Sequence, residues 1–398
     1  MLWPGLLAAQ EAGPPRITEV SVTGLKRTKQ WVAEKPLQKF IGIETAALDP
    51  QEVRAAVLAE GILEPLEVDI VEEEGGWVLR VTVREKWSIF PLPIIKGDSG
   101  GWSFGGFFMD NNAFGMNDKF FAGGTYGSKA WLVAGGYMHT PMVTNMPGWG
   151  LSFSFSRQER RDTDPNALDL RVFNLDSIRG GGSLNFKLND YLALSSGVSY
   201  SNKMLKDSEQ AVNAPEESAQ FLELSAGASF RRSSWDGFFL SEERVQTGYS
   251  WTAGFGAPSW HRISLMAGWE KSIVPGFRFV LKGGGAWAPE IPVLGESSPN
   301  EAQVNILPSS FVARHFAGAS LGLEKHLFKF GFGSLSLFAS WQAIWTEGSV
   351  LDARFDHGPA GGVSLYLSKI AIPALAVGAA YNAAADYFQL SFSLGMSF

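Results

Sequence analysis

The last eleven residues of the chain alternate between apolar and small or polar side chains. Every even position is apolar, and every odd position is Gln, Ser or Gly. A period of two is that of a β-strand whose two faces meet different surroundings. The segment therefore predicts a final strand with one apolar face, made up of Phe388, Leu390, Phe392, Leu394, Met396 and Phe398.

The same alternation recurs along most of the chain after residue 100. In Leu222–Arg231 the alternate positions are Glu, Ser, Gly, Ser and Arg, and in Phe277–Lys282 they are Arg, Val and Lys. A Lys or Arg on the lipid face costs about 2–4 kcal/mol near the bilayer midplane, so these charges must point inward. The pattern predicts a mostly β protein that crosses a membrane as a barrel with an apolar outer face and a polar lumen.

Sixteen such segments are counted between residue 101 and the end of the chain. They start near residues 102, 118, 129, 149, 168, 181, 191, 220, 245, 261, 277, 317, 334, 361, 374 and 387. The average of about 18.6 residues per strand and turn suits membrane strands of about 9–11 residues. We therefore predict a 16-stranded antiparallel transmembrane β-barrel over residues 101–398, with 14 strands as the alternative.

The connections between these strands predict a barrel with two unequal ends. The longest connection, Ala288–Arg314, has 27 residues. A connection of this length without its own secondary structure is usually functional or disordered. We expect the longer loops to lie at one end, namely Asn111–Asn117, Thr140–Gly148, Lys203–Ala219, Ala288–Arg314 and Thr346–Pro359.

Residues 16–86 carry a different pattern, with helical spacing and a dense share of charge. Ile17–Val22 alternates as a strand does, and Lys29–Ile41 has near-helical spacing interrupted by a proline. Asp49–Gly61 begins with an N-cap Asp followed by Pro and ends at Gly, which marks a second helix. Leu66–Ile70 and Trp77–Val83 alternate again. The order β-α-α-β-β predicts a small α+β domain whose helices cover one face of a three-stranded sheet.

Two short segments flank this domain. Residues 1–13 are apolar and end in small residues, so they are interpreted as the remnant of an export signal, with a disordered tail as the alternative. Residues 87–100 contain two prolines and are expected to form a linker between the small domain and the barrel.

Composition narrows the class of protein further. The chain has 398 residues, 45 Gly, 29 Phe, 14 Trp, no Cys and a formal charge of −7. High aromatic content with only 18% charged residues excludes intrinsic disorder. The absence of Cys excludes a disulfide scaffold and a thiolate metal site. The acidic balance argues against a nucleic-acid partner.

The sequence contains no motif that predicts catalysis. Gly318–Gly322 fits G-x-S-x-G, but it lies within an alternating strand rather than at a strand-to-helix turn. The glycine triplets have no P-loop Lys. The five histidines are scattered through separate segments. We therefore expect no enzymatic activity, no catalytic residues, no cofactor and no metal site.

Several short motifs identify a family resemblance. Val22-Thr23-Gly24 ends the first predicted strand, Val81–Lys86 (VTVREK) closes the last strand of the small domain, and Asp110–Asn117 (DNNAFGMN) reads D-x-N-x-x-G. With a small α+β domain followed by a barrel, the chain resembles the POTRA-plus-β-barrel superfamily of outer-membrane insertases and translocases, of the BamA, TamA and FhaC type. The resemblance extends from about residue 16 to residue 398 and implies a single POTRA-like domain.

The resemblance implies a role for the longest loop. In the family, the sixth loop folds into the lumen and places an arginine against an acidic residue of a neighbouring strand. The corresponding segment here, Phe311–Phe316, lacks the family's glycine, and its arginine is Arg314. The strand that follows contains Glu324. We therefore expect Arg314 and Glu324 to anchor the sixth loop in the lumen.

Edge physics and the resemblance together predict how such a barrel acts on clients. The first and last strands meet at a seam, predicted between Trp102–Met109 and Phe388–Phe398, and glycines weaken strand pairing there. The predicted seam glycines are Gly105, Gly106 and Gly395. The edge strand of the small domain is expected to capture clients by strand addition. Its predicted client-binding residues are Leu66, Val68 and Ile70.

The resemblance implies assembly or translocation of proteins at a bacterial outer membrane. The partners are then unfolded outer-membrane or secreted proteins, the lipid bilayer and periplasmic accessory proteins, and the small domain lies in the periplasm. The alternating apolar residues that end at Phe398 resemble the targeting signal of outer-membrane barrels. The alternatives are a two-partner secretion translocase, a passive channel or a structural barrel.

Overall fold

The computed structural model describes residues 14–98, 101–127, 130–139, 147–189, 191–206, 211–235, 239–331, 333–349, 351–367 and 375–394. The chain divides into two compact units. One ends at Trp87 and includes Asn111–Asp118; the other comprises Ser88–Asp110 and Lys119–Phe398. No helix among the described residues is long and apolar enough to cross a bilayer.

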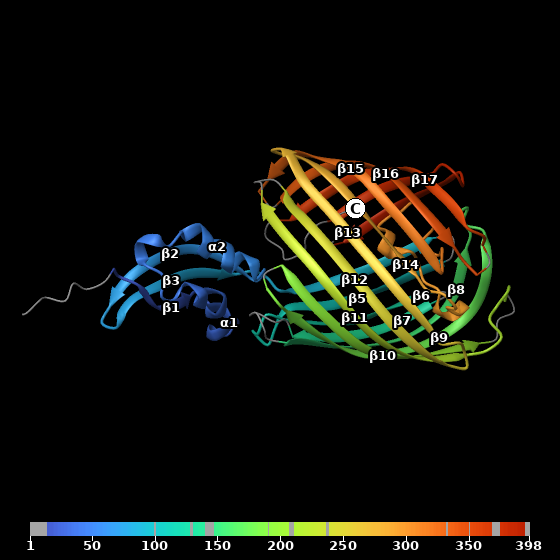
Figure 1. Ribbon diagram of the computed structural model, residues 1–398, viewed down its shortest axis with the longest axis horizontal. Helices are drawn as coiled ribbons and strands as arrows, with labels where there is room; N and C mark the ends of the chain where they lie inside the picture. Colours follow the sequence, from blue (N-terminus) through green and yellow to red (C-terminus); the bar gives the residue numbers. More distant parts are fainter. Residues whose placement is uncertain are drawn as a thin grey trace, which may run out of the picture. The chain divides into compact units, whose positions relative to one another are not determined.

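The smaller unit is the predicted α+β fold (Figure 1). Its sheet has the order β1-β3-β2, with β1 parallel and β2 antiparallel to β3. Its elements are β1 (Ile17–Thr23), α1 (Gln30–Glu34), the 3₁₀ helices η1 (Lys35–Phe40) and η2 (Thr45–Ala47), α2 (Pro50–Ala59), β2 (Leu63–Glu73) and β3 (Gly76–Glu85).

Pro36 divides the first predicted helix in two. The α-helical part ends at Glu34, and the chain continues as η1. A proline inside a helix lacks the N–H needed for the next hydrogen bond, which explains the change. The second helix begins as predicted, because the Asp49 side chain accepts a 2.8 Å hydrogen bond from the Gln51 N–H. Leu37 and Val53 are fully buried in the core beneath the sheet.

Glu85 ties the end of β3 to the segment before α1. Its carboxylate accepts hydrogen bonds from the consecutive backbone N–H groups of Lys26, Arg27 and Thr28, at 3.1, 3.0 and 2.6 Å. Burial raises the pKa of the Glu85 carboxyl, but these N–H groups favour the charged form more strongly and hold the pKa below its ordinary value. The carboxylate therefore organises a loop that has no regular structure of its own.

The D-x-N-x-x-G turn belongs to this unit. The Asn112 side chain accepts a hydrogen bond from the Asn117 N–H at 2.8 Å, which closes the turn. The Lys29 N–H donates to the Gly115 carbonyl at 2.9 Å. Gly115 has φ +73°, and a Cβ there would lie 2.1 Å from the Arg27 carbonyl oxygen. Only glycine fits this close approach of two backbone segments.

The larger unit is a 16-stranded antiparallel sheet curled into a barrel (Figure 1). Each strand pairs with its neighbours in the chain. The strands are β4 (Ile89–Asp98), β5 (Gly101–Ala113), β6 (Asp118–Gly127), β7 (Ala130–His139), β8 (Pro147–Thr163), β9 (Asp169–Lys187), β10 (Leu192–Lys206), β11 (Ala219–Trp235), β12 (Leu240–Phe255), β13 (Trp260–Val274), β14 (Phe277–Trp287), β15 (His315–Phe330), β16 (Gly333–Glu347), β17 (Arg354–Leu367), β18 (Leu375–Asn382) and β19 (Tyr387–Leu394).

The predicted number of strands is right, but the prediction misses one strand and divides another into two. The expected linker over residues 87–100 contains β4, whose ten residues pair with β5. The segments that start near 168 and 181 form one strand, β9, of 19 residues. The prolines of β4 hide its strand character, and Gly180–Gly182 resembles a turn although it continues the ladder with β10. The two errors cancel in the count.

Because of these errors, the prediction also assigns the early loops to the wrong end of the barrel. Successive antiparallel connections alternate between the ends, so a missed strand reverses the assignment of every following loop. The connection over Asn111–Asn117 therefore lies at the end opposite to Ala288–Arg314. Most of the predicted loop Thr140–Gly148 lies outside the described residues. Because the prediction wrongly divides β9 into two strands, it adds one reversal and assigns the later loops to the correct end again. We call the end that carries Ala288–Arg314 the loop end.

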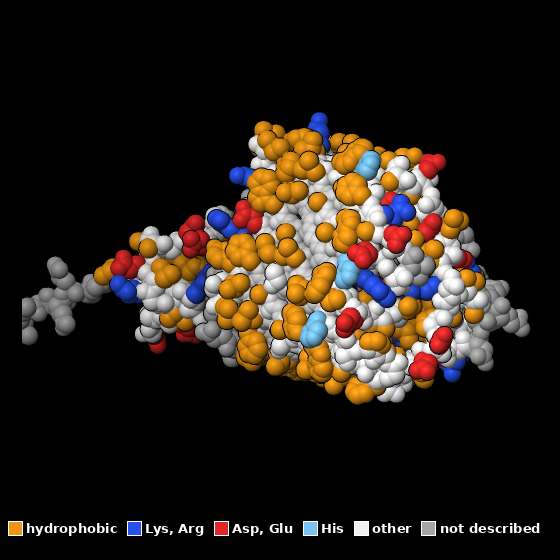
Figure 2. Space-filling model, turned by 45° about the vertical axis from the view of Figure 1, so that its right-hand side comes forward, with side chains coloured by type: hydrophobic (Ala, Val, Ile, Leu, Met, Phe, Trp, Pro, Cys, Tyr) orange, Lys and Arg blue, Asp and Glu red, His pale blue; other side chains and the backbone are white. Residues whose placement is uncertain are grey.

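The two faces of the sheet carry the predicted side chains. On β8, Leu151, Phe153 and Phe155 are 60%, 51% and 43% exposed, as expected of a lipid-facing surface. Figure 2 shows apolar side chains over much of this outer face. The alternate positions, such as Arg278 and Glu324, are only 3% exposed, so their charges lie inside the barrel.

The sheet ends at two edges. β4 pairs with β5, and β19 pairs with β18 from Tyr387 to Leu394. Among the described residues, no pairing joins β4 to β19. The seam of the barrel therefore lies between these two strands.

Candidate functional site: the barrel lumen and its long loop

The longest loop packs inside the barrel. Ala302, Ile306 and Ala313 are fully buried, and they form one apolar cluster with Phe316 and Ile344 from the inner face of the sheet. Further back, Ile291 and Leu294 pack against inward aromatic side chains of several strands, Phe173, Phe221 and Trp260. The loop therefore has an apolar core of its own within the lumen.

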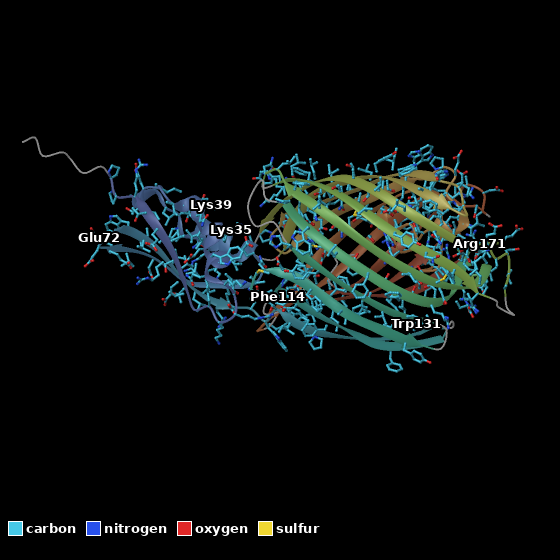
Figure 3. All side chains as sticks on the ribbon, turned by 90° about the horizontal axis from the view of Figure 1, so that it is seen from below. Lys35, Lys39, Glu72, Phe114, Trp131 and Arg171 are labelled. Atoms are coloured by element: carbon cyan, nitrogen blue, oxygen red, sulfur yellow. The ribbon has the colours of Figure 1, made fainter. Side chains whose placement is uncertain are left out.

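Charged groups hold the first half of the loop. The Glu296 carboxylate accepts hydrogen bonds from Arg171 of β9 at 2.5 Å, from Arg314 at 3.1 Å and from the Ser349 N–H at 3.0 Å. Arg171 also pairs with Asp162 at 2.9 Å, and the Glu296 and Asp162 side chains are 0% and 1% exposed. Arg171 lies at the end of the barrel drawn on the right in Figure 3.

Arg160 of β8 completes this arrangement. It pairs with Asp162 at 2.7 Å and donates a 3.2 Å hydrogen bond to the Glu296 carbonyl oxygen. We refer to Arg160, Asp162, Arg171, Glu296 and Arg314 as the latch. Its members come from β8, β9 and the long loop, so it joins the loop to one side of the barrel.

The tip of the loop reaches the opposite wall. Gln303, in the left-handed region with φ 54°, donates to the carbonyl oxygens of Ala267 and Gly283 at 3.0 and 3.2 Å. The Gln303 side chain also accepts a 2.5 Å hydrogen bond from Arg244 of β12. Glu301 pairs with Arg262 of β13 at 2.7 Å.

The last part of the loop contacts the end of the sheet. The Asn305 N–H donates to the Gln342 side chain at 2.7 Å. Gln389 of β19 donates to the carbonyl oxygens of Asn305 and Leu307, the latter at 3.0 Å. The loop thus crosses the lumen from β9 to β19 and bonds directly to one edge strand of the sheet.

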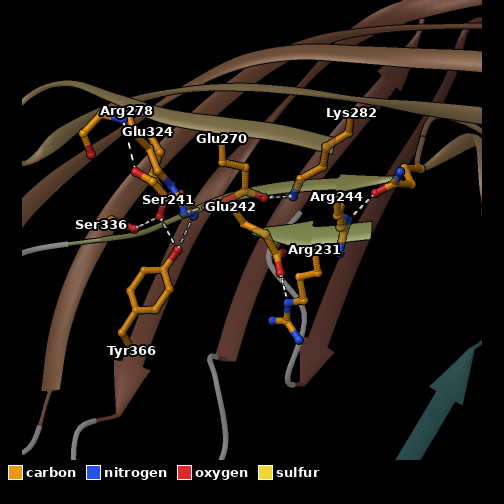
Figure 4. Close-up of polar contacts among 12 residues, drawn as sticks. Arg231, Ser241, Glu242, Arg244, Glu270, Arg278, Lys282, Glu324, Ser336 and Tyr366 are labelled. Atoms are coloured by element: carbon orange, nitrogen blue, oxygen red, sulfur yellow. Dashed lines mark hydrogen bonds and ion pairs between the residues drawn. The ribbon is translucent and has the colours of Figure 1, made fainter. Parts of the chain in front are cut away.

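A second ionic cluster lies within the wall itself (Figure 4). Arg278 of β14 pairs with Glu324 of β15 at 2.5 Å and with Glu270 of β13 at 2.6 Å. Lys282 pairs with Glu270 at 3.2 Å. All four are at most 5% exposed. We refer to Glu270, Arg278, Lys282 and Glu324 as the wall cluster.

Neutral and aromatic groups complete the wall cluster. Tyr366 of β17 donates to Glu324 at 2.7 Å, and the Ser336 hydroxyl donates to the same carboxylate. The Phe239 ring, which precedes β12, is 2% exposed and lies 4.7 Å from the Arg278 guanidinium. With these groups the cluster links five consecutive strands, β13 to β17, and is covered by an aromatic ring.

The predicted pair Arg314 and Glu324 is not formed. Arg314 bonds to Glu296 of its own loop, and Glu324 bonds to Arg278 of the neighbouring strand. Each predicted residue therefore belongs to a buried charge network, but to a different one. Glu296 and Arg171 could not be found from the sequence, because their pairing bridges 125 positions and neither stands in a recognisable motif.

The predicted seam glycines are misplaced. Gly105 and Gly106 lie in β5, which has β4 on one side and β6 on the other. A Cβ at Gly105 would lie 2.1 Å from the Gly124 carbonyl oxygen of β6, so glycine permits close strand packing within the sheet. The third residue, Gly395, lies outside the described residues. The seam is formed by β4 instead of the segment that starts at residue 102.

The other predicted residues lie on exposed strands. Phe388 and Leu390 of β19 are 59% and 76% exposed, Phe392 and Leu394 lie in the same strand, and Met396 and Phe398 lie outside the described residues. In the small unit, β2 is an edge strand. Of the three predicted client-binding residues, Val68 and Ile70 pack against the core, and Leu66, at a register shift, is exposed.

The histidines are less scattered than the sequence suggests. His261, His315 and His357 each stack on an aromatic ring of the preceding strand, with ring centroids 5.8–5.9 Å apart. Within the described part of the chain, no group of three or more His, Asp or Glu side chains is placed to hold a metal ion.

Three solved structures share the fold of this chain. CdiB from Acinetobacter baumannii matches 96% of the chain and 74% of its own length, with a TM-score of 0.65 and 11% identity. CdiB from Escherichia coli matches 96% of the chain and 75% of its own length, with a TM-score of 0.63 and 15% identity. BamA from Haemophilus ducreyi lacking POTRA domains 1–3 matches 95% of the chain and 84% of its own length, with a TM-score of 0.57 and 13% identity.

Neither a family model nor a curated protein matches the sequence. The likeness is therefore one of fold. At that level it confirms the predicted resemblance, because BamA and CdiB share the fold of this chain.

Proposed function

We propose that this chain inserts or translocates other proteins at an outer membrane, and that clients engage the seam between β4 and β19. One observation carries the proposal: the lumen is crossed by a latched loop, whereas the sheet has two edges that are not paired with each other among the described residues. A strand edge offers unpaired backbone groups to an incoming strand. The shared fold with BamA and CdiB supports the same reading.

The location follows from the surface of the barrel. An apolar outer face requires a lipid bilayer, and closed barrels of this kind are typical of outer membranes. We place the small unit in the periplasm, where it would receive unfolded outer-membrane or secreted proteins and accessory proteins. The exposed edge strand β2 and Leu66 are the proposed capture site for an extended client segment.

A second candidate is a two-partner secretion translocase. The inner face of β8–β11 is lined by small hydroxyl side chains, which would let an extended polypeptide slide without strong binding. These residues are Ser152, Ser154, Ser156, Ser183, Ser195, Ser199, Ser225 and Ser229. Movement of the long loop would be required to open this path, because the loop occupies the lumen.

Reconstitution into liposomes tests the proposal. The purified chain is incorporated, and a denatured client barrel is added outside; insertion is read as protease-protected, heat-modifiable client. We expect insertion above that of empty liposomes and small, flickering conductance in planar bilayers. Large, steady openings without client insertion would contradict the proposal and favour a passive channel. Passage of a secreted client into the liposome, without insertion of the barrel client, would select the translocase.

A further inference from the structure

The strand β4 contains two prolines, Pro91 and Pro93, within one unbroken ladder. Ten consecutive residues of β4 pair with β5, with Pro91 opposite Phe108 and Pro93 opposite Gly106. A proline has no N–H and cannot donate to a neighbouring strand. In sheets, proline is accordingly confined to positions whose nitrogen faces an open edge.

The spacing of the prolines decides which side of β4 they affect. In an antiparallel ladder, alternate residues bond to one neighbour and the residues between them bond to the other. Pro91 and Pro93 are two positions apart, so their nitrogens face the same side. Because the ladder with β5 is unbroken and a proline nitrogen cannot donate to it, the donors to β5 come from the even positions, such as Leu92. The proline nitrogens then face the edge that borders the seam.

The two edge strands of the sheet differ in their proline content. Pro91 itself is exposed. On the other edge of the sheet, β19 contains no proline and pairs with β18 along its whole length. The two strands that meet at the seam therefore differ in the hydrogen bonds that they can offer.

We propose that Pro91 and Pro93 keep the seam unzipped over the first half of β4, so that β19, or a client strand that replaces it, pairs with β4 only from Ile95 onward. A strand opposite the prolines would leave two carbonyl groups without donors at membrane depth, which is unfavourable. The prolines thus supply the weakness that the sequence analysis assigned to glycines. The role of a client rests on the proposed function; the state of the seam does not.

Hydrogen exchange of the full chain in nanodiscs tests the proposal. The variant Pro91→Ala with Pro93→Ala restores two donors to the edge. We expect exchange over Tyr387–Leu394 to slow by about tenfold or more, as two added hydrogen bonds predict. Pro359→Ala in β17, a strand proline away from the seam, is the matched control and leaves this exchange unchanged. Unchanged exchange in the double variant would overturn the proposal.

A second pair of variants covers the case in which the double variant does not fold. Ile95→Pro removes a third donor from the same edge and is expected to speed exchange in β19 while β5 stays protected. Ile94→Pro faces the other way and is expected to expose Gly101–Ala113 instead. If the two variants have the same effect, the proline nitrogens do not face the seam, and the proposal is wrong.

The same samples separate this inference from the proposed function. Slower exchange together with reduced client insertion supports both. Slower exchange with unchanged insertion supports the role of the prolines at the seam and contradicts insertion of clients through it. Unchanged exchange refutes the inference, whatever the insertion assay gives.

Discussion

The latch and the wall cluster are both buried charge networks, yet they connect different kinds of elements. The wall cluster joins strands that are already hydrogen-bonded neighbours, such as β14 and β15 through Arg278 and Glu324. The latch joins Glu296 of a loop to Arg171 of β9, which is far away in the sequence. Loss of the wall cluster therefore weakens a sheet that stays in place, whereas loss of the latch frees an element that can move.

This difference shows where movement is possible in the lumen. A buried ion pair adds little net stability, but removal of one partner leaves a buried charge and is costly. In the wall, that penalty protects the register of the strands. In the latch, it holds the loop across the lumen. If the chain translocates clients as proposed, the latch is the element that a client must displace.

The largest loss of stability is expected in the wall. Arg278→Met leaves Glu324 and Glu270 buried without their main partner, and the free energy of unfolding should fall by about 3–5 kcal/mol. Denaturant unfolding in micelles, followed by Trp fluorescence, measures it. Arg157→Met is the control, because Arg157 is 57% exposed where it pairs with Asp176. Solvent screens this exposed ion pair, so the free energy of unfolding should stay nearly unchanged. If both variants lose the same free energy of unfolding, the buried wall cluster is no more important for stability than an exposed ion pair, which contradicts the account.

The latch variant should cost less stability but change the pore more. In Glu296→Gln, Arg171 keeps Asp162, so we expect a loss of about 1–3 kcal/mol. The released loop should raise single-channel conductance and admit protease within residues 288–314. Glu301→Gln, which removes only the pair with Arg262, is the matched control. If Glu301→Gln opens the pore as far as Glu296→Gln does, the latch is not what holds the loop.

A smaller effect is expected where the loop tip rests on the wall. A Cβ at Gly284 would lie 2.3 Å from the Glu301 carbonyl oxygen and 2.2 Å from that of Leu265. Gly284→Ala should therefore lift the tip and cost about 1–3 kcal/mol through overpacking. At Gly248 a Cβ would meet only the Ser264 hydroxyl, at 2.8 Å, and this side chain can turn away. Gly248→Ala should be close to neutral, and equal unfolding midpoints for the two variants would refute the contact.

The smallest effect is expected at Glu85, whose carboxylate is held by backbone N–H groups rather than by an arginine side chain. The pKa of Glu85 is held below its ordinary value by the N–H groups of Thr28, Arg27 and Lys26, although burial acts in the opposite direction. Its stabilising contribution is therefore complete above the pKa of the unfolded chain and is lost as the pH falls through the lowered value. Hydrogen exchange at Lys26–Thr28, corrected for intrinsic rates, should rise at acid pH. Glu85→Gln should remove this pH dependence, and a dependence that persists in this variant would assign it to another group.

The sequence predicts local features well and distant pairings poorly. The α+β order of the small unit and the two faces of the sheet follow from periodicity, which depends on neighbouring residues only. The number of strands is right only because the missed strand β4 and the divided strand β9 cancel. β4 is missed because prolines mark linkers more often than strands, although an edge strand tolerates them. Arg314 and Glu324 are predicted to meet but belong to separate networks. Their true partners, Glu296 and Arg278, depend on strand register and on the path of a 27-residue loop, which no local pattern fixes.

The central claim is that clients engage the seam between β4 and β19, and a reversible lock tests it most directly. The chain has no Cys, so one Cys in β4, at Ile94, Ile95 or Lys96, and one in β19, at Gln389, Leu390 or Ser391, give a set of pairs from which a crosslinking pair is selected. Client insertion into liposomes is then measured before and after reduction. We predict that the oxidised barrel inserts no client and that reduction restores insertion. Full insertion by the oxidised, crosslinked barrel would contradict the account.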